Sequence, residues 1–241
     1  MIELKNLTKK YADFKALDNL SLSIPKGEIF GFIGPNGAGK TTTIKMMGGI
    51  LAPTSGTITI GGIRMDENPE DAKRKIGFIP DRPYLYEKLT GMEFLHFVAD
   101  LYNVSETDFK KKAEEQLSVF SLSDWPNELI ESYSHGMKQR LIMAAALLHD
   151  PEVIIVDEPT VGLDPEAVKL LKDLFQALAK QGVTVFMSTH TLQVAEAICD
   201  RIGVIRKSRL IATGTMQELK KAANTDGDLE HVFLTLIAEG G

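Results

Sequence analysis

Cysteine is nearly absent from this chain. Among its 241 residues only Cys199 could form a disulfide, so a disulfide within the chain is excluded, and such a composition is typical of a reducing compartment. Positive charge is not in excess either, because the formal net charge is -6 at pH 7. This composition gives no sign of a nucleic-acid-binding protein, and we expect no nucleic-acid partner.

Long apolar runs are also missing. The longest, residues 141–148, is far shorter than the roughly 20 residues that a helix needs to cross a bilayer. The N-terminal segment MIELKNLTKKYADF alternates apolar and polar residues and lacks the apolar stretch of a signal peptide. We therefore expect a soluble, cytoplasmic protein, which another subunit must hold if it works at a membrane.

Apolar segments alternate with helix-like segments along much of the chain. Three nearly all-apolar segments are typical of central parallel strands that are covered on both faces: 28–33, 153–156 and 183–188. Further strands are expected at 2–7, 20–24, 57–60, 76–79 and 201–206, and helices at 40–50, 165–180 and 191–199. The alternation indicates an α/β fold with a mostly parallel sheet.

Residues 90–148 differ, because helix-like segments follow one another there with no strand between them. The expected helices are 91–102, 106–121 and 136–149, and a short amphipathic helix is expected at 228–239. We predict a single domain, residues 1–241, whose α/β core of 1–85 and 150–241 is interrupted by an all-helical subdomain at 86–149.

The clearest motif is GPNGAGKTT, between the apolar segment 28–33 and a predicted helix. It fits G-x-x-x-x-G-K-[ST], in which glycines let the backbone wrap a polyphosphate at a helix N-terminus; Lys40 then reaches the β- and γ-phosphates and the Thr41 hydroxyl binds Mg²⁺. A glycine-rich turn that matches by chance is expected on the order of once in a hundred such chains. The motif predicts a nucleotide site formed by Gly34, Pro35, Asn36, Gly37, Ala38, Gly39, Lys40, Thr41 and Thr42.

Chemically active side chains also follow two of the apolar segments. Asp157 and Glu158 directly follow the apolar segment 153–156, and His190 lies two residues after the apolar segment 183–188. The carboxyl ends of parallel strands border the crevice where such sheets bind ligands, so Asp157 is suited to hold Mg²⁺ and Glu158 to polarise an attacking water. His190 could then contact the γ-phosphate and that water. The plainer alternative is an acid pair that caps a loop and a histidine with a structural role.

The segment ESYSHGMKQRL, residues 131–141, begins a helix in an unusual way. Ser134 is a good N-cap, but Gly136 in the first turn weakens a helix by roughly 1 kcal/mol relative to alanine. Lys138 and Arg140 lie near the helix end whose dipole favours anions. A small, positive helix start of this kind could bind an anion, although an awkward but ordinary cap is the alternative.

With these motifs in this order, the chain resembles an ATP-binding cassette (ABC) ATPase over essentially its whole length. SHGMKQR is similar to the signature segment of that family, LSGGQ followed by basic residues, with Tyr133, His135 and Met137 in place of Leu, Gly and Gln. Ser134 and Gly136, which must approach phosphate, are kept.

Within the family, the chain resembles the branch that contains drug, antibiotic and sodium exporters with separate membrane subunits. The segments of this sequence that carry the resemblance are the variant signature, IGFIPDRPYLYEKLTGMEFL at 76–95 and LEHVFLTL at 229–236. This resemblance implies an exporter's ATPase subunit on the inner face of the cell membrane, bound to a polytopic transmembrane subunit.

The resemblance also implies a P-loop NTPase (RecA-like) core, an N-terminal antiparallel β part and a helical subdomain that carries the signature. ATP and Mg²⁺ would be the cofactors, with Lys40, Glu158 and His190 as catalytic residues. Two cassettes, which we expect to be identical copies, would pack head to tail around two ATPs, so that Ser134 and Gly136 of each copy meet the γ-phosphate bound by the other.

Three further positions gain a role from the resemblance alone. Tyr11 falls where the family places an aromatic residue that stacks on adenine, and Asp164 in VGLD where an aspartate crosses the dimer interface. Asp81 stands where most members carry a glutamine that contacts Mg²⁺ and the attacking water. Aspartate is shorter and anionic, so we expect a water-mediated contact and place Asp81 with Thr41 and Asp157 in the metal site.

Some questions stay open at the level of sequence. Tyr84, Tyr86, Phe94 and Phe97 either line the groove that receives a short helix of the membrane partner or pack inside the helical subdomain. A non-transport cassette that acts on ribosomes or DNA is an alternative, and the Asp81 and signature substitutions leave room for a weakly hydrolysing regulatory cassette. The cargo cannot be named, because the membrane subunit would select it.

Overall fold

The computed structural model describes residues 1–82, 84–160 and 165–239. Its strands are β1 (Ile2–Tyr11), β2 (Phe14–Ile24), β3 (Ile29–Ile33), β4 (Ser55–Ile60), β5 (Ile63–Arg64), β6 (Ile76–Ile79), β7 (Val153–Asp157), β8 (Thr184–Thr189), β9 (Arg201–Arg206) and β10 (Arg209–Gly214). Its helices are α1 (Lys40–Met47), α2 (Pro69–Arg74), α3 (Gly91–Leu101), α4 (Glu106–Val119), the 3₁₀ helix η1 (Ile130–Ser132), α5 (His135–Leu147), α6 (Pro165–Lys180), α7 (Leu192–Ile198), α8 (Met216–Ala222) and α9 (Leu229–Glu239).

Two sheets organise the described part of the chain. The larger has the order β10-β9-β3-β8-β7-β6, in which every pair is parallel except β10 with β9. The smaller is antiparallel, with the order β2-β1-β4-β5. The predicted α/β fold, with a mostly parallel core and an antiparallel N-terminal part, is confirmed.

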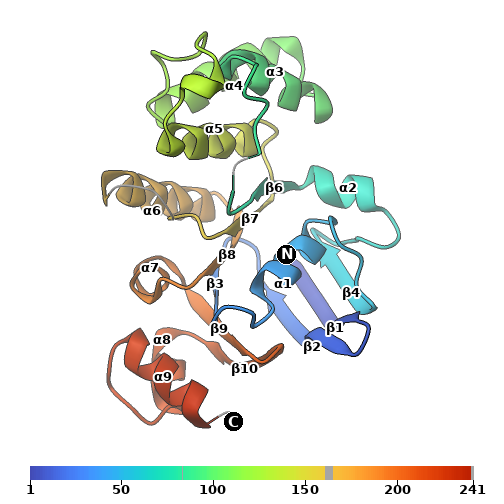
Figure 1. Ribbon diagram of the computed structural model, residues 1–241, viewed down its shortest axis with the longest axis vertical. Coiled ribbons are helices and arrows are strands. Elements are labelled where there is room, and N and C mark those ends of the chain that lie inside the picture. The colour runs from blue at the N-terminus through green and yellow to red at the C-terminus, as the bar shows by residue number, and fades with distance from the viewer. Residues whose placement is uncertain (83, 161–164, 240–241) are drawn as a thin grey trace.

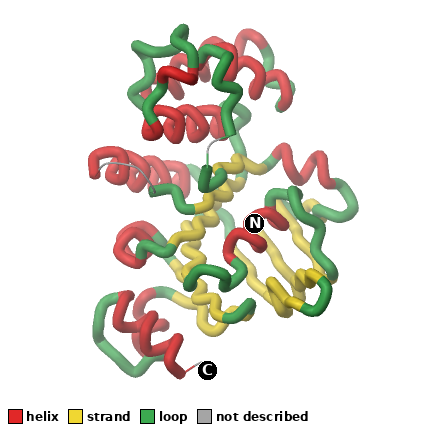
Figure 2. Tube along the Cα trace, in the orientation of Figure 1, coloured by secondary structure: helices red, strands yellow, loops and turns green. Residues whose placement is uncertain are grey.

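The central strands are buried and mostly apolar because both faces of the main sheet are covered (Figures 1 and 2). In β7, Ile154 and Val156 belong to the core shared with α5 and α6, whereas Val153 and Ile155 belong to the core shared with α1 and the smaller sheet. All of β7 and of β3 is buried. The carboxyl ends of these strands are therefore held by packing on two sides.

Helices α3, α4 and α5 gather at one end of the molecule, and α8 and α9 lie at the other (Figure 1). The whole apolar run 141–148 is buried, because α5 packs against α3, α4 and β6. No helix among the described residues is both long and apolar enough to span a bilayer. The division at residues 86 and 149 stays a prediction, although α3, α4, η1 and α5 do follow one another between β6 and β7, with no strand there among the described residues.

Several predicted boundaries need correction. The strand expected at 2–7 continues to Tyr11, because β1 pairs with both β2 and β4 over this length. The helix expected at 40–50 ends at Met47, since Gly48 forms its C-cap and Gly49 is left-handed. Sequence patterns also missed β5, α2, β10 and α8.

His149 joins the helical end of the molecule to the sheet. Its ring stacks on Tyr102 of the α3 C-cap, with centroids 3.7 Å apart, and its Nε2 lies 3.1 Å from the Ile76 carbonyl oxygen. Burial lowers the pKa of His149 to about 4. The folded protein thus favours the neutral imidazole, whereas the unfolded chain binds a proton near the ordinary pKa.

We therefore expect the free energy of unfolding to fall on acidification through the window between pH 6.5 and 4, in which the unfolded state binds more protons. His149 alone should remove about 2 kcal/mol between pH 7 and pH 5. Urea unfolding at several pH values measures this slope. His149→Phe, which keeps an aromatic ring beside Tyr102, should flatten it, and an unchanged slope would assign the effect to other groups.

Candidate active site

The loop 34–39 connects β3 to α1. Gly37 and Gly39 adopt φ values of +78° and +112°, which side chains with a Cβ rarely adopt, and a Cβ on Gly39 would lie 2.6 Å from the Ala16 carbonyl oxygen. Helix α1 begins with no side-chain cap and no acidic residue in its first turn. Its first amides and the positive end of its dipole are therefore available to an anion.

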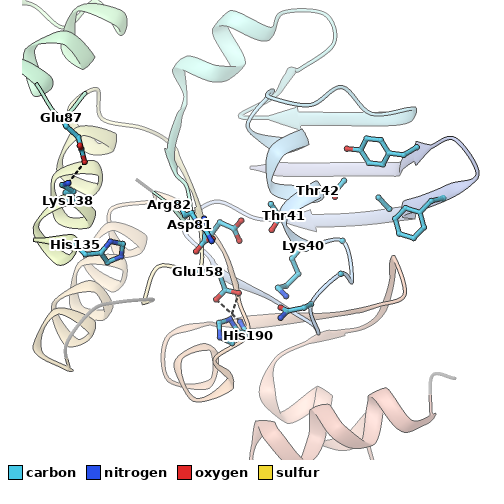
Figure 3. Close-up of a pocket in the computed structure, with 17 residues that line it drawn as sticks. Lys40, Thr41, Thr42, Asp81, Arg82, Glu87, His135, Lys138, Glu158 and His190 are labelled. Atoms are coloured by element: carbon cyan, nitrogen blue, oxygen red, sulfur yellow. Dashed lines mark hydrogen bonds and ion pairs between the residues drawn. The ribbon is translucent and has the colours of Figure 1, made fainter. Parts of the chain in front are cut away.

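A pocket of about 920 Å³ lies in front of this loop (Figure 3). Four separate parts of the chain line it: the phosphate loop with α1, the β1–β2 hairpin, the ends of β6, β7 and β8, and the helical end. The lining residues are Tyr11, Phe14, Ala16, Asn36, Gly37, Gly39, Lys40, Thr41, Thr42, Asp81, Arg82, Glu87, His135, Lys138, Asp157, Glu158 and His190. Gly34, Pro35 and Ala38 of the predicted site support the loop and do not line the pocket; Gly34 and Ala38 are buried.

Lys40 is held inside the phosphate loop. Its ammonium donates hydrogen bonds to the carbonyl oxygens of Gly34 at 2.7 Å and Pro35 at 3.3 Å. Burial lowers the pKa of Lys40, and the charges of Glu158 and Asp157 oppose that shift. The side chain is thus a buried cation beside two acids, placed where a polyphosphate could compete for its hydrogen bonds.

Asp157 is the last residue of β7 and is buried. Burial raises the pKa of its carboxyl group, while the hydroxyl groups of Ser188 and Thr41 lower it and the charges of Glu158 and Asp81 raise it further. The carboxylate therefore lies close to the hydroxyl at the start of α1, the arrangement that the sequence motifs predicted.

Glu158 and His190 form a pair at the rim. Glu158 Oε1 lies 2.9 Å from His190 Nδ1, and Oε2 accepts the backbone N–H of His190 at 3.2 Å. The Glu158 side chain is only 13% exposed and that of His190 is 58% exposed. One face of the pair is therefore packed against the strand ends, and the other opens to the pocket (Figure 3).

The residues predicted to hold Mg²⁺ fit that ion. Thr41, Asp157 and Asp81 all line the pocket and offer only oxygen atoms, which Mg²⁺ prefers. Among the described residues, no three acidic, histidine or cysteine side chains are grouped to hold a metal ion by themselves. A cation here would need further oxygen ligands from water or from a bound phosphate.

Two aromatic residues border the far side of the pocket. Tyr11 is 50% exposed and Phe14 is 62% exposed, and they face each other across the β1–β2 hairpin. The Lys9 ammonium lies 5.2 Å from the centre of the Tyr11 ring. Phe14 was not predicted from the sequence; the signal that could have found it is its position opposite Tyr11 at a tight turn.

Helix α5 begins as the sequence predicted. The Ser134 hydroxyl caps it by accepting the Met137 N–H at 3.2 Å, and its first turn contains no acidic residue. A Cβ built on Gly136 would meet no atom within 4 Å, and its φ is not positive. The protomer's own fold therefore does not require glycine at this position.

The two basic side chains that follow Gly136 are occupied within the chain. Lys138 forms a 2.6 Å ion pair with Glu87, and Arg140 donates to the Phe120 carbonyl oxygen at 3.2 Å. The interpretation that both make the helix start more positive needs correction for Lys138, whose charge Glu87 compensates; Arg140 bonds to a neutral carbonyl oxygen and keeps its charge. Ser134 and Gly136 do not line the pocket, although His135 does.

The remaining predicted positions separate into three groups. Asp164 lies outside the described residues. Phe94 is buried among the helices, so the packing alternative holds for it. Tyr84, Tyr86 and Phe97 are exposed, with the rings of Tyr86 and Phe97 in an edge-to-face contact at 5.4 Å.

Of the pocket residues, six were not predicted from the sequence as site residues: Phe14, Ala16, Arg82, Glu87, His135 and Lys138.

Comparison with known proteins agrees with this geometry. The sequence model of the family described as ABC transporter matches residues 17–161. The linearmycin resistance ATP-binding protein LnrL of Bacillus subtilis (strain 168) is 40% identical over 219 residues, which cover 91% of this chain and 70% of LnrL.

Two solved structures share the fold. An ATP-binding subunit of an ABC transporter superposes with a TM-score of 0.93 at 33% identity, covering 98% of this chain and 99% of that one. The dimeric ATP-binding cassette MJ0796, in a post-hydrolysis state bound to ADP and Pi, superposes with a TM-score of 0.79 at 31% identity, covering 90% of this chain and 99% of that one. This chain therefore belongs to the ABC transporter family and has the fold of its nucleotide-binding ATPase domains.

Proposed function

We propose that this chain is the ATP-hydrolysing subunit of a membrane exporter, and that two copies enclose two ATPs head to tail. The observation that carries the hydrolytic part is the Glu158–His190 pair, which shares one pocket with Lys40 and the uncapped start of α1. The resistance function in the name of LnrL supports the exporter. The dimeric MJ0796 structure with ADP and Pi supports the paired arrangement.

In the proposed reaction, the α1 amides and Lys40 bind the β- and γ-phosphates, and Tyr11 with Phe14 borders the adenine. Glu158 orients the attacking water and draws off its proton, while His190 holds Glu158 in place and contacts the γ-phosphate. Mg²⁺, when bound by Thr41 and Asp157 with Asp81 nearby, would neutralise phosphate charge. Positioning and electrostatic stabilisation then supply most of the rate enhancement.

The proposed dimer explains the unusual start of α5. Because the protomer leaves open space around Gly136, the reason for glycine lies outside the protomer. A partner's γ-phosphate, approached by the Ser134 hydroxyl and the first amides of α5, is such a reason. Asp164 would cross the same interface. ATP would then shift the equilibrium between the open and the closed dimer only because it binds more tightly to the closed one.

The membrane partner would contact the exposed aromatic residues Tyr84, Tyr86 and Phe97, and the chain would then lie at the inner face of the membrane. We expect detergent extraction with an affinity-tagged copy to co-isolate a polytopic membrane protein, and the complex to hydrolyse ATP severalfold faster than the chain alone. Replacing Tyr84 and Tyr86 together with glutamate should abolish co-isolation and leave basal turnover unchanged.

Leu234→Glu is the control, because Leu234 is an apolar residue on α9 about as exposed as Tyr86, and α9 lies at the other end of the molecule from the helices α3–α5 (Figure 1). It should retain the complex. Co-isolation of ribosomal RNA that is lost at high salt, with no membrane protein, would instead support the non-transport alternative.

A further inference from the structure

Ser188 contacts both acids of the active site, although no sequence motif singles it out. It lies in β8 directly opposite Asp157 of β7 and is completely buried. Its hydroxyl donates a hydrogen bond to Asp157 Oδ1. Its carbonyl oxygen accepts the backbone N–H of Glu158 at 2.9 Å. One residue of the neighbouring strand therefore holds the side chain of one acid and the backbone of the other.

The backbone of Glu158 shows why this contact matters. Glu158 has a φ of +50°, in the left-handed region that glutamate rarely adopts. The Glu158 N–H still completes the parallel ladder by donating to the Ser188 carbonyl oxygen, and the chain turns away from the strand directly after this bond. A conformation of this kind persists only where its surroundings fix it, and here the bonds from Ser188 and His190 do so.

We propose that Ser188 is a positioning residue, whose hydroxyl fixes the rotation of the Asp157 carboxylate so that it can engage the metal–nucleotide complex. This inference rests on the role of Asp157 in the proposed function. A carboxylate with one oxygen held by a fixed donor loses less rotational freedom on binding a ligand, and removing such a supporting hydrogen bond typically weakens metal binding about 10- to 100-fold.

The competing explanation is that this hydrogen bond only provides an acceptor for the buried Ser188 hydroxyl and has no effect on metal binding. The same strand offers a control that tests this explanation. Thr184, at the other end of β8, is also fully buried. Its hydroxyl donates to the Pro25 carbonyl oxygen at 3.1 Å and accepts the Gly27 N–H at 3.0 Å, far along the strand from the acids. Ser188→Ala and Thr184→Val both remove a buried hydroxyl group from β8, so both should lower the melting temperature.

The test measures Mn²⁺ binding by electron paramagnetic resonance in the presence of saturating non-hydrolysable ATP analogue, AMP-PNP. Ser188→Ala should weaken Mn²⁺ binding about 10- to 100-fold. Its affinity for AMP-PNP without metal should stay within about twofold of wild type, since Ser188 does not line the pocket. Thr184→Val should bind Mn²⁺ as wild type does. Ser188→Thr restores the hydroxyl and should recover most of the Mn²⁺ affinity if this variant folds. If it does not fold, the comparison of Ser188→Ala with Thr184→Val decides the question.

Equal Mn²⁺ affinity in Ser188→Ala and Thr184→Val would overturn the positioning role and leave the proposed function intact. If Mn²⁺ does not bind to the wild-type protein with AMP-PNP, the proposed function and this inference fail together.

Discussion

Replacing Glu158 with glutamine should reduce ATP turnover about 10²- to 10⁴-fold while ATP binding changes little. The substitution keeps the size of the side chain and an oxygen that can accept a hydrogen bond from His190. It removes the negative charge, and with it the ability to take a proton from water. Only a 13% exposed carboxylate beside His190 is altered, so the phosphate loop and the adenine side should be unaffected.

Steady-state phosphate release and equilibrium nucleotide binding give the two quantities separately. Glu152→Gln is the matched control, because Glu152 precedes β7 and pairs with Lys75 at 2.8 Å, at the opposite end of the strand from the pocket. It should keep full turnover. If Glu158→Gln retained more than about a tenth of the wild-type rate, Glu158 would not be the general base.

The same variant should accumulate as an ATP-bound dimer. In the proposed cycle, ATP closes the dimer and only hydrolysis reopens it, so blocking hydrolysis traps the closed state. Light scattering after size-exclusion chromatography should therefore show a dimer for Glu158→Gln with ATP and a monomer without nucleotide. A monomer at saturating ATP would separate hydrolysis from dimer closure.

Much of the site was predictable because its parts are local in sequence. The phosphate loop is a continuous segment whose glycines, lysine and threonine must follow one another between a strand and a helix. Asp157, Glu158 and His190 were found because the ends of parallel strands meet at one edge. The register that places Ser188 opposite Asp157 was not readable, since it depends on how β7 and β8 align and not on either segment alone.

Other parts of the fold carry weak signals. The turn between β9 and β10 is formed by Lys207 and Ser208, with φ values of 45° and 68°. Such left-handed pairs usually contain glycine or asparagine, so nothing in this sequence marked a hairpin there. Ser208 is held in this conformation by tertiary contacts, because its hydroxyl donates to the Lys15 carbonyl oxygen at 2.7 Å. Short elements such as α2 and α8 likewise lack the length that makes a periodic pattern recognisable.

The pairing at the helical end was hidden for a related reason. Lys138 and Glu87 are far apart in the sequence but form an ion pair in the structure. The hydrogen bond from Lys138 lowers the pKa of Glu87, so the charge of this lysine is compensated locally. The order of charges along the helix therefore overstated the positive field at its start, because it could not show that Glu87 pairs with Lys138. The role of Gly136 stays a prediction, although packing within the protomer does not require glycine there.

Introducing aspartate at Ser134 should block ATP-dependent dimerisation and leave ATP binding by the monomer intact. Aspartate caps helices as well as serine does, so α5 should keep its start. The added carboxylate would face the γ-phosphate of the partner at the proposed interface, where like charges repel by several kcal/mol. We expect the dimer affinity to fall at least about a hundredfold, and turnover to fall with it.

The chain supplies a close control for this change. Ser105 caps α4 with the same geometry, accepting the Asp108 N–H at 3.2 Å, and is exposed. Ser105→Asp adds the same charge to another helix cap of the same part of the molecule, so it should dimerise and hydrolyse ATP as wild type does.

Gly136→Ala provides a second, uncharged test: the protomer has room for the methyl group, so the helix should be more stable by up to about 1 kcal/mol. Dimer affinity should nevertheless decrease, because the methyl group meets the partner's nucleotide. Normal dimerisation of both Ser134→Asp and Gly136→Ala would place the start of α5 outside the interface, and the pocket would then have to complete itself within one protomer.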